Sequence, residues 1–266
     1  MSKGFFGRSL SKSEYEIVSL LALKKKGLVG LEEASGLLGI EKKRLWGIFH
    51  RLERKGWLER IERGKYLVVP FQAREGWLEH PFVLAASLAK KYYVSYRTAL
   101  AHYGLTEQLP VFVYVATTER KGKLERRLQN YVFRFVRIKK GKFFGFKAVL
   151  VDGKKVFVAE KEKAIVDCLD KERYSGSIIE IAKALSGRGI NLGKVKKYAL
   201  KMGNSSLIRR LGYLLDLLKK DSSGLEKHIG SYRNVYLSTV LPKKALKTDR
   251  KWRLFVNAGR RDLLEW

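Results

Sequence analysis

The clearest chemistry in this sequence lies in a run of basic side chains between residues 41 and 55. Lys43, His50 and Arg54 recur at helical spacing, with Gly47 between them. Such a face suits nucleic acid, because lysine and arginine neutralise phosphates and reach base edges in the major groove. Gly47 would allow close approach to the DNA. The segment predicts DNA contacts from Lys42, Lys43, Arg44, Trp46, Gly47, His50, Arg51 and Arg54.

The opposite side of the same segment is apolar. Leu45, Ile48, Phe49 and Leu52 follow the i, i+3, i+4, i+7 pattern of a helix that packs on a core. An ordinary amphipathic helix with a solvated charged face is the plainer interpretation. A protein-interaction module is a further alternative, since winged helices also serve in that role.

The flanking elements favour DNA binding. Helices are expected at 13–26, 31–38 and 41–55, followed by strands at 57–61 and 65–69 joined by the turn 62–64. This order predicts a winged helix-turn-helix domain over residues 1–75, with the third helix as the recognition helix. The hairpin would form a basic wing from Arg60, Arg63 and Lys65.

The net charge points toward a polyanionic partner. The 266 residues hold 56 lysines and arginines against 26 acids, a formal charge of +30. Residues 1–76, 77–172 and 173–266 carry +7, +9 and +14, so no single tail holds the excess. Solubility alone accounts for a net charge of about 8 more readily than for this value. Double-stranded DNA is the expected partner, with RNA as an alternative.

Several classes of protein are disfavoured. No apolar run is long enough to cross a bilayer, and no signal-peptide core follows Met1. The lone Cys168 and four scattered histidines predict no disulfide and no metal site. We therefore expect a cytoplasmic protein without a membrane partner and without cofactors.

Beyond a polar link at 72–76, the pattern predicts a larger mixed region over 76–266, with a subdivision near residue 173 as an alternative. The fold class is thus α+β: an N-terminal winged helix-turn-helix, then a mixed α/β region with a helical C-terminal part. Expected helices are 81–91, 96–102, 123–129, 161–169, 178–185, 192–202 and 205–219. Expected strands are 111–117, 131–139, 143–151, 155–159, 234–238 and 252–257.

Catalysis is not expected. Asp152-Gly153-Lys154 fits a loose nuclease pattern, but a two-residue hairpin turn explains Asp152 and Gly153 better. A nucleotidyltransferase needs paired aspartates after its Gly-Ser loop, and none follow Gly176-Ser177. We predict that the protein is not an enzyme and has no catalytic residues.

Other charged groups allow two interpretations. The acids at 160, 162, 167 and 170 indicate a solvated helix face, with Asp167 pairing a nearby arginine. Arg209 and Arg210 would contact a partner or phosphate, or pair with Asp216 or cap buried carbonyls. Trp252 is expected in the core. A second basic surface, for DNA backbone or an acidic protein partner, would comprise Lys243, Lys244, Lys247, Arg250, Lys251 and Arg253.

Five stretches together resemble the AbiEi family of antitoxins. They are RGKYLV at 63–68, YRTALAHYGLT at 96–106, VAEKEKAIVD at 158–167, RRLGYLL at 209–215 and KWRLFVN at 251–257. The family consists of winged-helix transcriptional regulators from type IV toxin–antitoxin, or abortive infection, loci. The resemblance implies an N-terminal domain that represses its own operon at operator DNA. It also implies that the larger C-terminal part neutralises a cognate nucleotidyltransferase toxin.

Overall fold

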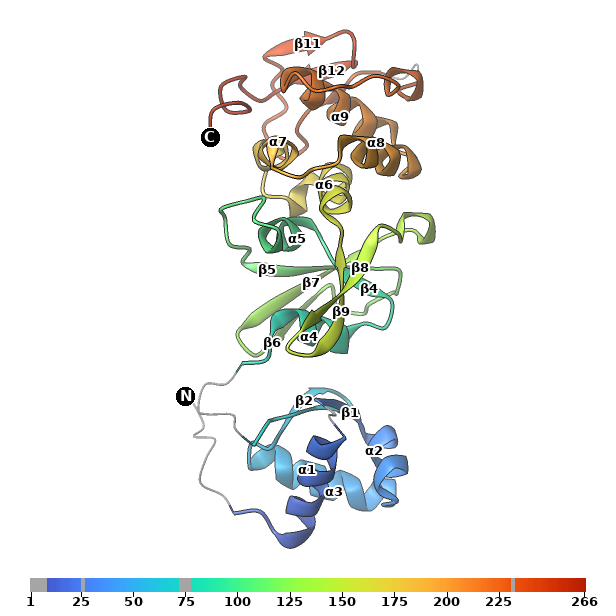
Figure 1. Cartoon of the computed structure of the whole chain (residues 1–266), viewed down its shortest axis with the longest axis vertical. Helices are drawn as coiled ribbons and strands as arrows, with labels where there is room; N and C mark the ends of the chain where they lie inside the picture. Colours follow the sequence, from blue (N-terminus) through green and yellow to red (C-terminus); the bar gives the residue numbers. More distant parts are fainter. Residues whose placement is uncertain (1–8, 25–26, 72–77, 231–232) are drawn as a thin grey trace. The chain divides into compact units, whose positions relative to one another are not determined.

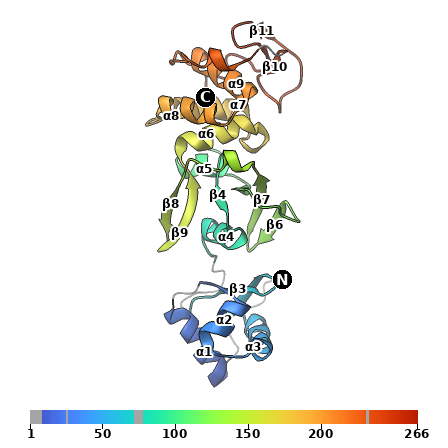
Figure 2. The same cartoon turned by 90° about the vertical axis from the view of Figure 1, so that its right-hand side faces the viewer.

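The computed structural model describes residues 9–24, 27–71, 78–230 and 233–266. The chain divides into two compact units, Met1–Glu79 and His80–Trp266. Figure 1 labels the helices and strands of both units, and Figure 2 gives a second view. The expected polar link at 72–76 lies outside the described residues.

Helices and a small antiparallel sheet build the first unit (Figures 1 and 2). In chain order the described elements are α1 (Lys12–Leu23), β1 (Leu28–Gly30), α2 (Leu31–Leu38), α3 (Lys42–Arg54), β2 (Leu58–Glu62) and β3 (Lys65–Val68). Strand β3 lies between β1 and β2. The predicted winged helix-turn-helix order is confirmed. The sequence did not predict β1, a short strand that pairs with the wing.

Local signals set the ends of these helices. Helix α1 begins one residue earlier than expected because Ser11 and Glu14 form a capping box, in which each side chain accepts a hydrogen bond from the other's backbone. Helix α2 ends at Gly39, whose φ of 65° is left-handed and therefore favours glycine.

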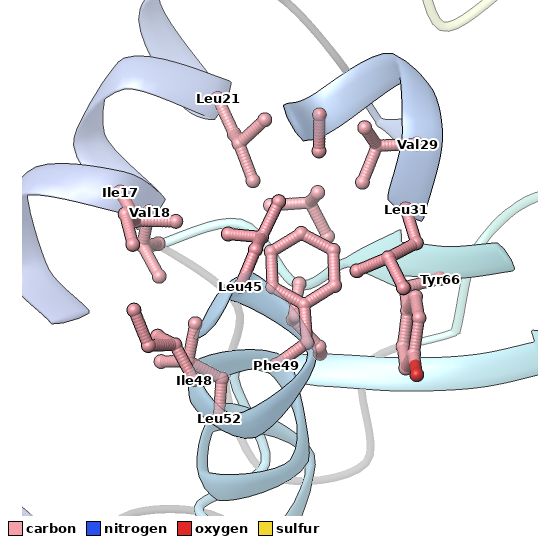
Figure 3. Close-up of a cluster of buried hydrophobic side chains, with 13 residues drawn as sticks. Ile17, Val18, Leu21, Val29, Leu31, Leu45, Ile48, Phe49, Leu52 and Tyr66 are labelled. Atoms are coloured by element: carbon pink, nitrogen blue, oxygen red, sulfur yellow. The ribbon is translucent and has the colours of Figure 1, made fainter. Parts of the chain in front are cut away.

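The core of the first unit contains side chains from its helices and from its sheet. Figure 3 shows Leu45, Ile48, Phe49 and Leu52 among side chains from α1, β1, α2 and the wing sheet. The predicted apolar stripe of α3 is therefore confirmed. Phe49 packs edge-on against Tyr66 of β3, with ring centroids 5.0 Å apart. This contact links α3 to the sheet that carries the wing.

A six-stranded sheet with the order β6-β7-β5-β4-β9-β8 organises the described part of the second unit. Its strands are β4 (Tyr92–Val94), β5 (Phe112–Thr117), β6 (Glu125–Leu128), β7 (Tyr131–Arg137), β8 (Phe146–Val151) and β9 (Lys154–Ala159). The pairs β5–β7 and β4–β9 are parallel, and the other neighbours are antiparallel. Helix α4 lies on one side of this sheet, and α5 and α6 lie on the other (Figures 1 and 2).

Helices cover the sheet and lead into a small C-terminal sheet. The helices are α4 (Pro81–Leu88), α5 (Tyr96–His102), α6 (Lys161–Asp170), α7 (Ile178–Ser186), α8 (Leu192–Lys201) and α9 (Ser205–Leu217). The last strands, β10 (Val235–Tyr236), β11 (Lys247–Asp249) and β12 (Leu254–Val256), form a sheet in the order β10-β12-β11. The α+β fold class is thus confirmed.

Two secondary-structure predictions in this unit are wrong. The expected helix at 123–129 is strand β6, which pairs antiparallel with β7 so that Glu125 faces Arg134. Pairing in the sheet outweighs the helix propensity of its residues. The helix expected at 81–91 ends at Leu88, and residues 92–94 form the interior strand β4. The turn at Asp152 and Gly153 is confirmed, with φ of 49° and 73° as a type I′ hairpin requires.

The sequence suggested that the acids of α6 form a solvated face, and this prediction is wrong. Glu162 and Asp167 are buried, and Asp167 pairs with the fully buried Lys163 instead of an arginine. Tyr93 and Ser95, on and just after β4, donate hydrogen bonds of 3.1 and 2.7 Å to Asp167. These bonds fasten α6 to the central sheet.

The later buried arginines also have structural roles. Arg209 donates to the carbonyl oxygens of Ile229 and Arg233, and Arg210 donates to that of Tyr236. The interpretation of these arginines as caps of buried carbonyls is therefore confirmed. Trp252 is fully buried, as predicted for a core residue, and its Nε1 donates to Asp216 at 2.7 Å.

Candidate nucleic-acid interface

The outer face of α3 presents the basic residues that the sequence selected. Lys43 and Arg54 are exposed on the side opposite the buried stripe, and Gly47 lies half-buried between them. The structure also exposes Arg44, Trp46, His50 and Arg51 on this helix. The face is therefore a continuous polar surface on a helix whose other side is fixed in the core.

A buried acid on α1 holds one edge of this face. Glu14 is 1% exposed, and it accepts from Arg51 Nε at 3.2 Å and from Lys55 Nζ at 2.6 Å. Burial alone would raise the pKa of Glu14, but hydrogen bonds from Lys55, Ser11 and Arg51 lower it to about 2. Glu14 therefore stays ionised at neutral pH and keeps Arg51 close to the helix surface.

Lys42 also forms an ion pair with an acid of the first unit. Its ammonium pairs with Glu32 of α2, and this hydrogen bond lowers the pKa of the Glu32 carboxyl. Lys43, Arg44 and Arg54 form no ion pair with any described residue. These three cations keep their full charge available for phosphates, whereas Lys42 and Arg51 share theirs with acids of the same unit.

Gly47 leaves the middle of the face without a side chain. A Cβ atom at this position would meet just one described atom within 4 Å, Arg51 Nη1 at 3.9 Å. The fold itself therefore does not require glycine here. Trp46 is 52% exposed, and its ring meets His50 edge-on at 5.7 Å. An exposed aromatic ring beside cations suits contact with a base or a thymine methyl.

The hairpin places the wing residues as predicted. Arg60 and Arg63 are exposed, and Gly64 completes the turn with φ of 72°. Lys65 pairs with Glu62 at 3.1 Å, so part of its charge is compensated. The Gly64 carbonyl accepts from the backbone of Leu31 at 2.7 Å, which joins the wing to the start of α2.

The second basic surface divides into two groups. Lys243, Lys244, Lys247 and Arg250 are exposed and form no ion pair within the described chain. Lys251 instead bridges Asp216 at 2.7 Å and Glu226 at 3.1 Å, and Arg253 donates to the Gly230 carbonyl at 3.0 Å. Lys251 and Arg253 are thus partly committed to the fold.

Among the described residues, no group of three or more histidines, cysteines or acids could hold a metal ion. Asp152 lies exposed at its hairpin turn. No helix within the described ranges has the length and apolar character needed to span a membrane. The interface on α3 is the stronger candidate for function because its cations and its glycine share one face.

Comparison with known families concerns this same segment. Residues 16–69 match the family described as "Transcriptional regulator, AbiEi antitoxin". The match covers most of α1, the helix-turn-helix and the whole wing hairpin. It confirms the resemblance seen in the sequence and supports a regulator or antitoxin role for the AbiEi-like first unit.

A similarity of fold to a solved structure extends beyond the first unit. The solved crystal structure of the RV2827C protein from Mycobacterium tuberculosis aligns with a TM-score of 0.67 and 14% sequence identity. The alignment covers 99% of this chain and 97% of that one. At this identity the likeness concerns the fold alone. A search of curated proteins gave no match.

Reasoning from the sequence missed Glu14 as the residue that positions Arg51. The signal was present in part, since Ser11-Lys12-Ser13-Glu14 is the Ser-x-x-Glu pattern of a capping box. That pattern predicts the start of α1. It does not predict that the same carboxylate reaches α3, because 37 residues separate Glu14 from Arg51.

Proposed function

We propose that this protein is a DNA-binding transcriptional regulator that represses its own operon. Helix α3 enters the major groove of the operator, and the wing residues Arg60 and Arg63 contact a neighbouring phosphate or the minor groove. The observation that carries the proposal is the exposed face of Lys43, Gly47 and Arg54 on a helix within the AbiEi-matching segment. The protein acts in the cytoplasm, without catalysis and without a cofactor.

Phosphate contacts would supply most of the affinity, and α3 would supply the choice of sequence. Lys43, Arg44 and Arg54 are best suited to phosphates because no acid of the described chain neutralises them. Gly47 would let a phosphate or base approach the helix backbone. Arg51 would add a donor whose position Glu14 has already fixed, which reduces the entropy lost on binding.

The antitoxin role is the second part of the proposal. The second unit would neutralise a cognate toxin of the nucleotidyltransferase type. Lys243, Lys244, Lys247 and Arg250 would meet an acidic toxin surface or a second stretch of DNA backbone, since their charges are exposed. Co-expression of the toxin with Lys244→Glu or Lys197→Glu tests the toxin contact. Loss of rescue is expected with Lys244→Glu, and rescue should be retained with Lys197→Glu, which changes an exposed lysine of α8 outside the second basic surface.

Operator binding is tested with the full-length protein and a labelled duplex from directly upstream of its gene. Contact with 6–10 phosphates should lower affinity roughly 10³–10⁵-fold between 50 and 200 mM salt. Lys43→Glu and Arg54→Glu should each weaken binding. Lys12→Glu is the matched control, because Lys12 is exposed in the same unit but lies on α1. A flat salt response, or equal loss with Lys12→Glu, would contradict the proposal.

RNA binding is distinguished by competition at fixed salt. The proposal expects duplex operator DNA to outcompete structured RNA of equal length, because the A-form major groove is too narrow for α3. Stronger competition by the RNA would favour the alternative that the basic surface serves RNA. If the protein bound neither the duplex DNA nor the RNA, the result would favour the alternative that it is a protein-interaction module.

A further inference from the structure

A cavity in the second unit lies at one end of the six-stranded sheet, where two parallel strands finish. It has a volume of about 350 Å³, and its lining residues are Thr118, Arg137, Ile138, Lys139 and Lys140. Strand β5 ends at Thr117 and β7 at Arg137, and these two residues are paired in register. Open sheets with parallel strands commonly bind ligands outside the carboxyl ends of those strands. The volume lies at the lower end of the range for small-molecule sites.

Hydrogen bonds to the backbone hold the two loops of this cavity next to each other. The amide of Ile138 donates to the carbonyl of Thr117 at 2.9 Å, so the residue after β7 stays paired with the end of β5. The ammonium of Lys171, just after α6, donates to the carbonyl of Arg137 at 3.2 Å. The fold therefore fixes the backbone from which the lining side chains extend.

The charged side chains of the lining are all positive. Arg137, Lys139 and Lys140 are exposed, and none of them forms an ion pair with a described residue. No acid lines the cavity. Asp170, at the end of α6, is already paired with Lys142 at 2.7 Å. Three positive charges therefore surround one cavity without an acid of the described chain to compensate them.

A hydroxyl group adds a neutral donor to these cations. Thr118 is half-buried in the cavity lining, and its hydroxyl has no hydrogen-bond partner among the residues that the structure describes. The hydroxyl of the preceding Thr117 is used differently, because it donates to the carbonyl of Lys91 at 2.6 Å. The Thr118 hydroxyl can therefore donate to a ligand oxygen without breaking a contact within the described chain.

We propose that this cavity binds a small anion that carries several phosphate charges, of the pyrophosphate type. Arg137 offers a planar fork of donors to phosphate oxygens, and Lys139 and Lys140 add point charges. Thr118 donates to a further oxygen. Three cations around one cavity match an anion with several charges in one small group, whereas DNA spreads single charges along each strand. The site uses no residue of α3 and goes beyond operator binding.

Calorimetric titration of the full-length protein tests the site. The probes are inorganic pyrophosphate, inorganic phosphate and sulfate at constant ionic strength. Saturable binding of pyrophosphate is expected, roughly 10-fold or more tighter than that of phosphate, as one additional charged hydrogen bond implies. Lys43→Glu should bind pyrophosphate as tightly as wild type, because Lys43 lies on α3. Absence of saturable pyrophosphate binding, or equal affinity for pyrophosphate and sulfate, overturns the proposal.

Two kinds of variant distinguish a specific site from general attraction to a basic surface. Arg137→Gln and Lys140→Gln change exposed residues, so the thermal midpoint should stay unchanged while pyrophosphate binding weakens roughly 10-fold or more. Thr118→Val keeps every charge and should still weaken binding roughly 2- to 10-fold. Lys155→Gln is the matched control, because Lys155 is exposed on β9 of the same sheet but does not line the cavity. Unchanged affinity in Thr118→Val, or an equal loss in Lys155→Gln, overturns the assignment.

Operator binding separates this site from the DNA interface. The proposal expects Arg137→Gln and Lys140→Gln to bind the operator duplex with the affinity of wild type. If these variants instead lowered both the operator affinity and the slope of its salt dependence, the cavity would hold DNA phosphates. The proposal of a small anion would then be wrong.

Discussion

Arg51 reaches back along α3 so that its Nη1 lies 3.9 Å from the place that a Cβ atom of residue 47 would occupy. Its Nε is meanwhile bonded to Glu14 of α1. The guanidinium thus borders the one position on the exposed face that has no side chain. Glycine at 47 is not required by packing, and its presence there fits a surface that something approaches closely.

Replacement of Gly47 by alanine should separate stability from binding. Because glycine costs about 0.5–1 kcal/mol relative to alanine inside a helix, Gly47→Ala should raise the free energy of unfolding by that amount. The added methyl group should at the same time weaken operator binding. Gly36→Ala in α2 is the control, since a Cβ there meets nothing within 4 Å. Unchanged DNA affinity in Gly47→Ala would show that nothing approaches this part of α3.

Glu14 should make the first unit sensitive to acid. Its folded-state pKa of about 2 lies below the ordinary value of 4.5, so the carboxylate stabilises the fold above pH 4.5. This contribution is lost as the pH falls through about 2. Glu14→Gln should lower the free energy of unfolding at pH 7 by about 1–3 kcal/mol, because charged hydrogen bonds from Arg51 and Lys55 are lost.

The measurement is urea unfolding of wild type, Glu14→Gln and Glu16→Gln between pH 7 and 2. Glu16 is the control, because it is exposed on the same helix. The difference between wild type and Glu14→Gln should shrink as the pH falls below 4.5. A difference that stays constant down to pH 2 would mean that the Glu14 carboxylate does not hold the two cations.

Lys163 and Asp167 should make coupled contributions to the free energy of unfolding. Lys163→Met leaves a buried carboxylate without its cation, so we expect a loss of about 3–5 kcal/mol in the free energy of unfolding. The double variant Lys163→Met, Asp167→Asn should recover much of that loss, because the neutral amide oxygen still accepts from Tyr93 and Ser95. Lys161→Met, at a partly exposed position of the same helix, should change stability little. Additive losses in the double variant, measured by thermal unfolding, would argue against a coupled pair.

Gly212 of α9 should tolerate no side chain. A Cβ atom there would overlap the ring of the buried Trp252, which Asp216 holds through its indole nitrogen. Gly212→Ala should therefore destabilise the second unit by about 1–3 kcal/mol, the usual cost of overpacking. Gly122→Ala, in an exposed loop where a Cβ meets nothing within 4 Å, is the control. Equal thermal midpoints for the two variants would contradict this packing.

Features with a local cause were predictable from the chain. The stripe from Leu45 to Leu52 predicted the buried side of α3, because 3.6 residues per turn place these positions together. The pair Asp152 and Gly153 predicted its hairpin, because both residues tolerate positive φ. The basic face of α3 followed from the same periodicity, as the side that remains once the apolar stripe is buried.

Features that depend on pairing at a distance were not predictable. Residues 125–128 have helical composition, yet they form β6 because β7 offers a free edge with matching register. The acids of α6 alternate with lysines like a solvated face, yet Glu162 and Asp167 are buried, and Asp167 pairs with Lys163 and accepts from Tyr93 and Ser95. Arg134 and Arg173 are remote in sequence, and only the sheet and the turn after α6 bring them to one pocket of the second unit.

The sequence by itself determined the winged helix-turn-helix, the cationic face of α3 and the large positive net charge, because helical periodicity and net charge are properties of the chain. The tertiary structure decided which cations are available. Glu14 engages Arg51, Glu32 engages Lys42, and Asp216 engages Lys251, since folding brings acids from other elements within bonding distance. Lys43, Arg44 and Arg54 keep their charge because no described acid reaches them.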